Sequence, residues 1–447
     1  MNQAQTIKVH QQIAMRSLAS LTPAARNART HSKKQVRQIA NSIERFGFTN
    51  PVLVDETGSI LAGHGRVAAA KLLGLSEVPA LCISDLSQAE RKAYLLADNK
   101  LALNAGWDLE LLALDLGELI DLDFDLDLTG FALAEVDSIL DAAAEADPAA
   151  PDPVLDRVSL HSGPAVTRTG DIWILGRHKL LCGDARSADD YAALMAGEAG
   201  GIVFTDPPYN VPIDGHVCGL GQFQHREFAM AAGEMSPAQF TNFLATALAR
   251  MIEHVRPGAI LYVCMDWRHM REMCEAGEIC GVELKNLVVW NKTNGGMGAF
   301  YRSKHELIFV FKYGDAPHVN SFGLGETGRY RTNVWDYPGI SSISATRGSD
   351  LAMHPTVKPV ALVADALRDC SRRGDIVLDP FAGSGTTLIA AEKTGRSARL
   401  IEFDPLYCDT IVQRFEAVTG KQAILAGCGK VWEDVAAARL AQQEVGQ

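Results

Sequence analysis

The stretch Asp375-Ile-Val-Leu-Asp-Pro-Phe-Ala-Gly-Ser-Gly-Thr-Thr387 decides the fold of this chain. A short apolar strand, 375–379, runs directly into a glycine-rich turn, and a helix is predicted to begin at about Thr386. Glycines let the backbone approach a ligand closely, and the helix N-terminus offers free N–H groups. Glu402 stands at the end of the next predicted strand, where a carboxylate can accept hydrogen bonds from both ribose hydroxyls. The pairing of turn and carboxylate predicts a nucleoside-type cofactor in a doubly wound α/β fold.

The sequence around this stretch, residues 158–447, alternates between strand-like and helix-like patterns. Such alternation predicts a mostly parallel sheet covered by helices on both faces, a Rossmann-like domain. Residues 293–350 interrupt the alternation with a segment rich in Gly, Ser, Tyr, Thr and Arg, which we interpret as an insertion. The predicted strands are 201–205, 259–266, 284–292, 305–313, 375–379 and 398–403, and the predicted helices are 236–255, 360–371, 386–394 and 405–418.

Two further regions precede this domain. In residues 1–105, Ser32 is placed to cap a helix that ends at Gly47, and short strand and helix patterns follow, so a small mixed α/β domain is predicted. In residues 106–157, Leu alternates with Asp and Glu before a Pro/Ala/Asp-rich stretch. We interpret this region as an acidic helical appendage and linker.

The net charge of −12 over 447 residues has to be divided among these regions before it is used. Residues 1–105 carry 13 Lys+Arg and 7 Asp+Glu, a net of +6, and residues 106–157 carry 1 and 15, a net of −14. The remaining 28 basic and 32 acidic residues give −4. Because the acidity is concentrated in the middle region, the total does not exclude binding to nucleic acid.

The composition, 47% apolar and 21% charged, is that of a globular protein and excludes a fibrous or disordered chain. No apolar run approaches the roughly 18 residues of a membrane span, and no secretory signal is visible. The nine cysteines include no C-x-x-C pair, so neither a disulfide framework nor a zinc site is predicted. We expect a reduced, cytoplasmic chain without a metal and without membrane contact.

A second motif, Asp206-Pro-Pro-Tyr209, ends the predicted strand 201–205. Two consecutive prolines stop a strand and stiffen the loop that follows. The motif suits methylation of an exocyclic amine, whose lone pair is delocalised into the aromatic ring. A carboxylate accepting one N–H and a Pro-Pro backbone carbonyl accepting the other would draw the nitrogen toward sp³ geometry, while Tyr209 stacks on the base.

These motifs together resemble the amino-group DNA methyltransferases that use S-adenosylmethionine, in the permuted order of their β group. The resemblance implies catalytic roles for Asp206, Pro207, Pro208 and Tyr209. It places the adenine of the cofactor near Asp184 and its methionine end near the segment His354-Pro-Thr-Val-Lys-Pro359. The cofactor-binding residues that follow are Asp184, Thr356, Lys358, Asp379, Phe381, Gly383, Ser384, Gly385, Thr386 and Glu402.

By the same resemblance, the insertion at 293–350 includes the target-recognition region. Residues 285–347 carry eight Lys+Arg and four Asp+Glu, a mixture that suits phosphate contact. The aromatic residues interleaved with them, which suit base stacking, are Tyr301, Tyr330, Trp335 and Tyr337. A solvated Gly-rich loop is the alternative.

The N-terminal domain resembles the ParB/sulfiredoxin-like superfamily over the segment Ile60-Leu-Ala-Gly-His-Gly-Arg-Val-Ala-Ala69. Gly63, His64, Gly65 and Arg66 correspond to that family's phosphate-contacting loop. The partition proteins have adjacent arginines where this chain has only Arg66, and no clear helix-turn-helix follows. A docking or specificity module is the alternative to phosphate or nucleotide contact.

The resemblances imply a methyltransferase that acts on a flipped base in double-stranded DNA. Adenine N6 is the favoured acceptor, because family members with Asp before Pro-Pro-Tyr mostly methylate adenine. The alternatives are a cytosine N4 DNA methyltransferase, an RNA or protein amine methyltransferase, and a DNA-binding, partition-like regulator with an inactive transferase domain. Formation of a homodimer and cooperation with a restriction endonuclease are left open.

Overall fold

The computed structural model describes residues 12–24, 28–122, 124–143, 161, 163–211, 233–292, 295, 300–322, 331–339 and 357–445. The chain forms two compact units, Met1–Ala143 and Ala144–Gln447, and each is described by itself. No helix in the described ranges is long and apolar enough to cross a membrane.

The first unit contains a four-stranded sheet in the order β1-β4-β2-β3, formed by Ile13–Ser17, Glu77–Cys82, Val52–Val54 and Ile60–Ala62. Its helices are α1 (Lys33–Phe46), α2 (His64–Leu72) and α3 (Gln88–Leu103). The predicted ends of α1 are confirmed: the Ser32 side chain accepts a hydrogen bond from the Gln35 N–H, and Gly47 ends the helix at a φ of 80°. The edge strand β1 and the helix α3 were not predicted from the sequence.

The acidic segment of the first unit is a packed group of helices. It comprises α4 (Leu109–Asp121), the short 3-10 helix η2 (Leu126–Thr129) and α5 (Leu133–Ala143). Leu112, Leu116, Leu126, Val136 and Ile139 form its small core. The alternation of Leu with acidic residues therefore marks amphipathic helices with a core of their own.

The second unit is built on a sheet of eleven strands among the described residues. Its centre, β8-β7-β12-β13-β6, is parallel, and antiparallel strands flank it on both sides. In spatial order the strands are β11 (Val334–Asp336), β9 (Glu283–Asn291), β10 (His305–Lys312), β8 (Val255–Met265), β7 (Gly200–Thr205), β12 (Ile376–Asp379), β13 (Ser397–Glu402), β6 (His178–Cys182), β5 (Ile172–Leu175), β14 (Ile424–Leu425) and β15 (Lys430–Val431).

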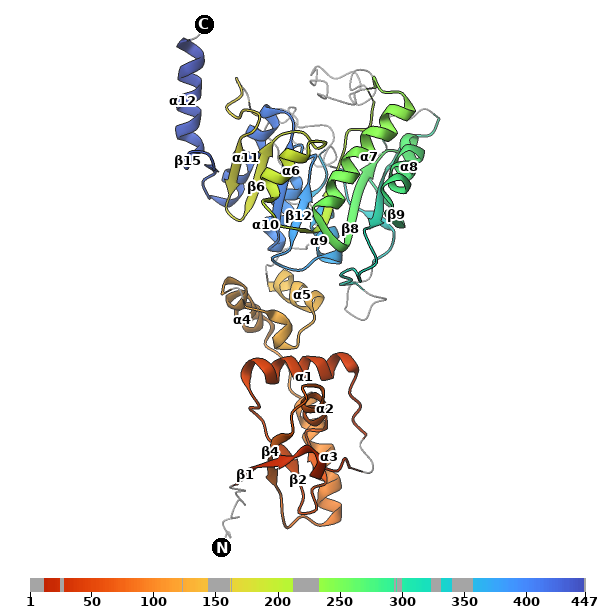
Figure 1. Ribbon diagram of the computed structural model, residues 1–447, viewed down its shortest axis with the longest axis vertical. Coiled ribbons are helices and arrows are strands. Elements are labelled where there is room, and N and C mark those ends of the chain that lie inside the picture. The colour runs from red at the N-terminus through yellow and green to blue at the C-terminus, as the bar shows by residue number, and fades with distance from the viewer. Residues whose placement is uncertain are drawn as a thin grey trace. The chain divides into compact units, whose positions relative to one another are not determined.

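Helices cover both faces of this sheet (Figure 1). Side chains of successive strand residues point to opposite faces. Ile202 and Phe204 accordingly join the core under α9, α10 and α11, and Val203 joins the core under α6, α7 and α8. The predicted fold class is confirmed: a doubly wound α/β domain preceded by a small mixed α/β domain. The helices are α6 (Ala188–Met195), α7 (Pro237–Glu253), α8 (Met270–Cys280), α9 (Val360–Cys370), α10 (Thr386–Thr394), α11 (Pro405–Thr419) and the C-terminal α12 (Trp432–Val445).

The neighbouring strands β7 and β12 form the switch point of the sheet. From β7 the chain continues through α7 to β8, and from β12 it continues through α10 to β13 on the opposite side. Ligands of open α/β sheets bind in the crevice at the carboxyl ends of such strands. The loops 206–209 and 380–385 leave from these two ends, so the topology brings the two predicted motifs together.

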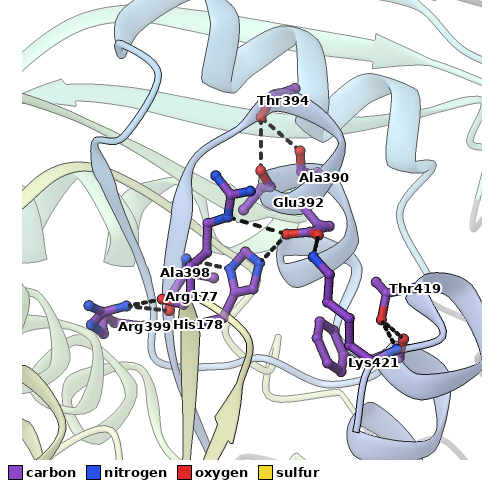
Figure 2. A network of polar contacts seen from close by, with 11 residues as sticks. Arg177, His178, Ala390, Glu392, Thr394, Ala398, Arg399, Thr419 and Lys421 are labelled. Carbon is purple, nitrogen blue, oxygen red and sulfur yellow. Dashed lines mark hydrogen bonds and ion pairs between the residues drawn. The ribbon is translucent and has the colours of Figure 1, made fainter. Parts of the chain in front are cut away.

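A buried histidine, His178, lies at the amino-terminal ends of the strands, opposite the switch-point loops (Figure 2). The Ala398 N–H donates to His178 Nδ1 at 2.9 Å, which leaves Nε2 to donate to Glu392 at 2.8 Å. Glu392 also accepts from Lys421 Nζ at 2.5 Å. Burial lowers the pKa of His178 and outweighs the opposing effect of Glu392. The neutral ring therefore joins β6, β13 and the last turn of α10, which fixes the helix that begins at the glycine-rich turn.

Candidate active site

Asp379 joins the two strand ends at the switch point. Its Oδ1 accepts from the Thr205 hydroxyl at 2.8 Å and from the Phe381 N–H at 3.1 Å. Its Oδ2 accepts from the Thr387 hydroxyl, in the first turn of α10, at 2.6 Å. Burial raises the pKa of Asp379 to about 6 against these hydrogen bonds. The carboxylate thus holds the end of β7, the glycine-rich turn and the start of α10 in one arrangement.

The two glycines of the turn have different tasks. Gly385 precedes α10 with a φ of 80°, and a Cβ there would lie 3.1 Å from the Ile411 side chain. It allows a left-handed turn packed against α11. Gly383 also has a positive φ, 53°, but open space surrounds its Cβ position. Only Gly383 therefore leaves room beside the backbone for a ligand.

Glu402 reaches the same turn from the end of β13. Its Oε2 accepts the Gly383 N–H at 2.8 Å, and its Oε1 accepts the Asp404 N–H at 2.9 Å. Burial raises the pKa of Glu402 to about 7. A carboxylate oxygen has about two lone-pair sites, so each oxygen can accept one more hydrogen bond. We refer to Asp379 and Glu402 as the loop carboxylates.

One cavity contains most of the predicted site residues. Its walls combine the loop carboxylates with apolar and aromatic side chains, including Phe381, Phe403 and Tyr407. The predicted residues that line it are Asp206, Pro207, Pro208, Tyr209, Lys358, Asp379, Phe381, Gly383, Ser384, Thr386 and Glu402.

The other predicted residues of this unit lie elsewhere. Gly385 lies behind the lining, and Thr356 falls outside the described residues. The Asp184 carboxylate accepts from the Arg186 N–H and guanidinium in an adjoining depression, although the next residue, Ala185, lines the cavity.

The predicted catalytic loop places Tyr209 and Lys358 on the two oxygens of Asp206. The Tyr209 hydroxyl donates to Oδ1 at 2.6 Å, and Lys358 Nζ donates to Oδ2 at 2.5 Å. Lys358 was predicted to support the cofactor. Its ammonium is bound by this carboxylate and lies 3.3 Å from the Tyr209 hydroxyl, and its contact with the cofactor stays a prediction.

Two residues that were not predicted extend this contact. Lys358 Nζ also lies 3.1 Å from Glu306 Oε2, and Lys292 Nζ is ion-paired with Glu306 Oε1. Asp206, Lys358, Glu306 and Lys292 therefore alternate in sign, and we call them the ion-pair chain. Because β10 runs antiparallel to β8, its first residues lie at the edge where β7 and β8 end. Sequence alone could have found Glu306 only by placing β10 in this antiparallel position.

The predicted recognition insertion separates into exposed and buried aromatic residues. Tyr301 is 82% exposed and packs edge-to-face on Phe300, which is 88% exposed. Trp335 and Tyr337 are buried, and the Trp290 indole donates to the Tyr337 carbonyl at 2.8 Å. The expectation that Trp335 and Tyr337 stack on bases is wrong in this arrangement, since both belong to the core. Tyr330 and the rest of the stretches 323–330 and 340–350 of the insertion lie outside the described residues.

In the first unit, the predicted phosphate loop makes internal hydrogen bonds. Arg66 donates to the carbonyls of Asn50 and Pro51 at 2.9 and 2.6 Å, and His64 accepts the Ala24 N–H at 3.3 Å. Gly63, with a φ of 98°, precedes α2, and Gly65 packs against Ile39. Phosphate contact at this loop stays a prediction.

Comparisons with known families agree with this architecture. A model described as DNA methylase matches residues 201–413, and one described as ParB N-terminal domain matches residues 2–100. A ParB-methyltransferase HTH domain model matches residues 110–169, where the sequence showed no clear helix-turn-helix. That match includes the helices α4 and α5.

Individual relatives resemble separate parts of the chain. The ParB-like nuclease domain-containing protein YnaK of Escherichia coli (strain K12) is 51% identical over 80 residues, which cover 18% of this chain and 92% of YnaK. The type II methyltransferase M2.MboI of Moraxella bovis is 23% identical over 225 residues, 49% of this chain and 81% of that protein. The crystal structure of M1.HpyAVI aligns with 53% of this chain and 96% of its own, at 21% identity and a TM-score of 0.38. Residues 201–413 belong to the N6/N4 family of DNA methyltransferases, and a ParB N-terminal domain and a ParB-methyltransferase helix-turn-helix domain precede them in the chain.

Proposed function

We propose that this enzyme transfers the methyl group of S-adenosylmethionine to adenine N6 of a base flipped out of double-stranded DNA. The observation that carries the proposal is the single cavity in which Asp206 of the Pro-Pro loop faces the glycine-rich turn and Glu402. Base flipping is required because the amine of a stacked, paired base cannot reach into a cavity at the carboxyl ends of the strands.

The described residues fit the nucleoside part of this cofactor. Glu402 has free acceptor positions for two ribose hydroxyls, and the open space at Gly383 lets a ligand approach the backbone. Phe381, Phe403 and Tyr407 offer apolar surface for an adenine ring. When bound, the cofactor supplies a methyl group activated by a positively charged sulfur.

The remaining task of the chain is to orient the amine. Asp206 would accept one N–H, and a backbone carbonyl of Pro207 or Pro208 would accept the other. Tyr209 would stack on the base, a contact worth about 1–3 kcal/mol. Its hydroxyl, bonded to Asp206, holds the ring and the carboxylate in a fixed relation. No covalent enzyme intermediate is needed, and orientation in a water-poor cavity would supply most of the acceleration.

Adenine is preferred over cytosine because Asp, rather than Ser, precedes Pro-Pro-Tyr in this chain. This preference rests on the family resemblance. Mass spectrometry of nucleosides from methylated duplex DNA tests it, since N6-methyladenine and N4-methylcytosine differ in mass. Finding only N4-methylcytosine would overturn the choice of base and leave amine methylation intact.

The central experiment is Asp206→Ala, measured by transfer of tritiated methyl groups to duplex DNA, RNA and protein. We expect DNA to be the acceptor and the variant to lose about a thousandfold or more in turnover, because orientation of the amine is lost. Calorimetry should show S-adenosylmethionine binding close to that of the wild type. Asp315→Ala, which removes an exposed carboxylate beyond β10, is the control and should keep full turnover. Near-normal turnover of Asp206→Ala would sink the mechanism.

A further inference from the structure

The ion-pair chain presents a problem for the proposed reaction. Both oxygens of Asp206 already have donors, the Tyr209 hydroxyl at 2.6 Å and the Lys358 ammonium at 2.5 Å. A carboxylate has room for a further N–H donor. A cation in direct contact nevertheless withdraws charge from the oxygen, so Asp206 would be a weak acceptor for the target amine.

Glu306 is a second carboxylate with which the Lys358 ammonium can form an ion pair. Its Oε2 lies 3.1 Å from Lys358 Nζ, and it lies 3.5 Å from the Tyr209 hydroxyl. A displacement of a few tenths of an ångström would turn the Lys358–Glu306 contact into the shorter of the two ion pairs. That displacement needs no change in the backbone, because Lys358 already lies between the two carboxylates.

Lys292 helps to keep Glu306 ionised, so that Glu306 can attract the Lys358 ammonium. It binds the other oxygen of Glu306, at the base of the hairpin formed by β9 and β10. Burial alone would raise the pKa of Glu306, but Lys358 and Lys292 outweigh it and lower the pKa to about 2. The pKa of Lys358 is raised by Asp206 and Glu306 despite burial, so its amine stays protonated. Lys358 therefore acts by its charge and does not take up a proton.

We infer that Glu306 is a positioning residue for methyl transfer, which draws the Lys358 ammonium away from Asp206 when the target amine binds. The inference rests on the proposed function, because it concerns the acceptor role of Asp206. Glu306 touches neither the methyl group nor the amine in this scheme. Its effect is to restore negative charge on Asp206 at the moment the amine needs an acceptor.

The test is Glu306→Gln, which keeps the shape of the side chain and removes its charge. Lys358 would then stay on Asp206, and we expect kcat to fall about 10-fold to 100-fold, the effect of one charged hydrogen bond. The dissociation constant for S-adenosylmethionine and the KM for DNA should stay near their wild-type values, because Glu306 contacts neither ligand. Glu306→Asp keeps the charge and should recover part of kcat. The matched control is Glu283→Gln, which removes the exposed carboxylate paired with Lys285 on β9 and should leave kcat unchanged.

A second variant separates this role from a merely structural one. In the double variant Glu306→Gln/Lys358→Met, the cation that weakens Asp206 is gone, so kcat at saturating cofactor should exceed that of Glu306→Gln alone. A double variant that is no faster than the single one would overturn the inference, as would Glu306→Gln with kcat within about twofold of the wild type. If the wild type itself transfers no methyl group to DNA, the proposed function fails, which is a different result.

Discussion

The loop carboxylates and the ion-pair chain lie at the same edge of one sheet, yet their charges are balanced in opposite ways. Within the described residues, the donors to Asp379 and Glu402 are hydroxyl and backbone N–H groups. Asp206 and Glu306 instead share Lys358, and Lys292 completes a set of two cations and two anions. Burial accordingly raises the pKa of Glu402 to about 7, whereas the lysines lower that of Glu306 to about 2.

The difference suits two kinds of ligand. A carboxylate whose donors are all neutral keeps a negative charge that no cation balances. A ligand with hydroxyl donors and a positive charge supplies that balance. A balanced set of charges gains nothing from such a ligand, and it can instead redistribute its contacts when a neutral amine enters. We therefore expect the first group to control cofactor affinity and the second to control turnover.

The largest effect that tests this division is on cofactor affinity in Glu402→Gln. We expect S-adenosylmethionine to bind about 10-fold to 100-fold more weakly, because hydrogen bonds to a charged acceptor are lost. In the wild type, protonation of Glu402 should weaken binding progressively as the pH falls below about 7. Calorimetry between pH 5.5 and 8.5 measures both effects. A variant that keeps the wild-type pH dependence would show that Glu402 is not the titrating group.

A smaller effect is expected on the stability of the free protein. The folded pKa of Glu402, about 7, is above its ordinary value of 4.5, so the wild type binds the proton more tightly when folded and loses stability as the pH rises between these values. The folded pKa of Glu306 is lowered to about 2, so its contribution is present above about 4.5 and is lost only as the pH falls toward 2.

Melting temperatures of Glu402→Gln and Glu306→Gln at pH 5.5 and pH 8 make this contrast measurable. Relative to the wild type, Glu402→Gln should gain roughly 1–3 kcal/mol in free energy of unfolding between the lower and the higher pH. Glu306→Gln should be less stable than the wild type, and the loss should be the same at pH 5.5 and at pH 8, because Lys358 and Lys292 lose a partner. Equal pH profiles of the two variants would remove the distinction between the two groups.

The sequence predicted the loop carboxylates better than the ion-pair chain for a physical reason. Asp379, Gly383 and Glu402 belong to consecutive elements, strand, turn, helix and strand, so the local pattern fixes their relation. Asp206 was found from its Pro-Pro context. Glu306 and Lys292 meet Asp206 only through the antiparallel pairing of β8, β9 and β10, which no local pattern reveals.

The same limit explains the aromatic residues of the insertion. Composition near Tyr301, Trp335 and Tyr337 suggested one basic, stacking surface. Trp335 lies on β11, which pairs with β9 and extends the sheet, so it faces the core under α9. Tyr337 is bound to Asp365 of that helix. Exposure, which depends on this strand pairing, could not be inferred from residue type.

The smallest effect concerns two exposed aromatic residues of the β9–β10 hairpin. Phe300 and Tyr301 lie between Lys292 and Glu306 in the β9–β10 hairpin, and Arg302 and Lys304 follow them in sequence. Because Lys292 and Glu306 of the ion-pair chain flank this loop, we expect its exposed rings to meet the bound DNA, where bases could stack on them.

Phe300→Ala/Tyr301→Ala should therefore weaken duplex DNA binding by about 1–3 kcal/mol, with cofactor affinity unchanged. Fluorescence anisotropy with a labelled duplex measures the loss. The comparison variant is Trp335→Ala, which empties a buried site and should lower the melting temperature. If loss of both exposed rings left DNA affinity unchanged, the hairpin would contribute to the reaction only through Lys292 and Glu306. The surface that recognises DNA would then have to lie on another segment of the chain.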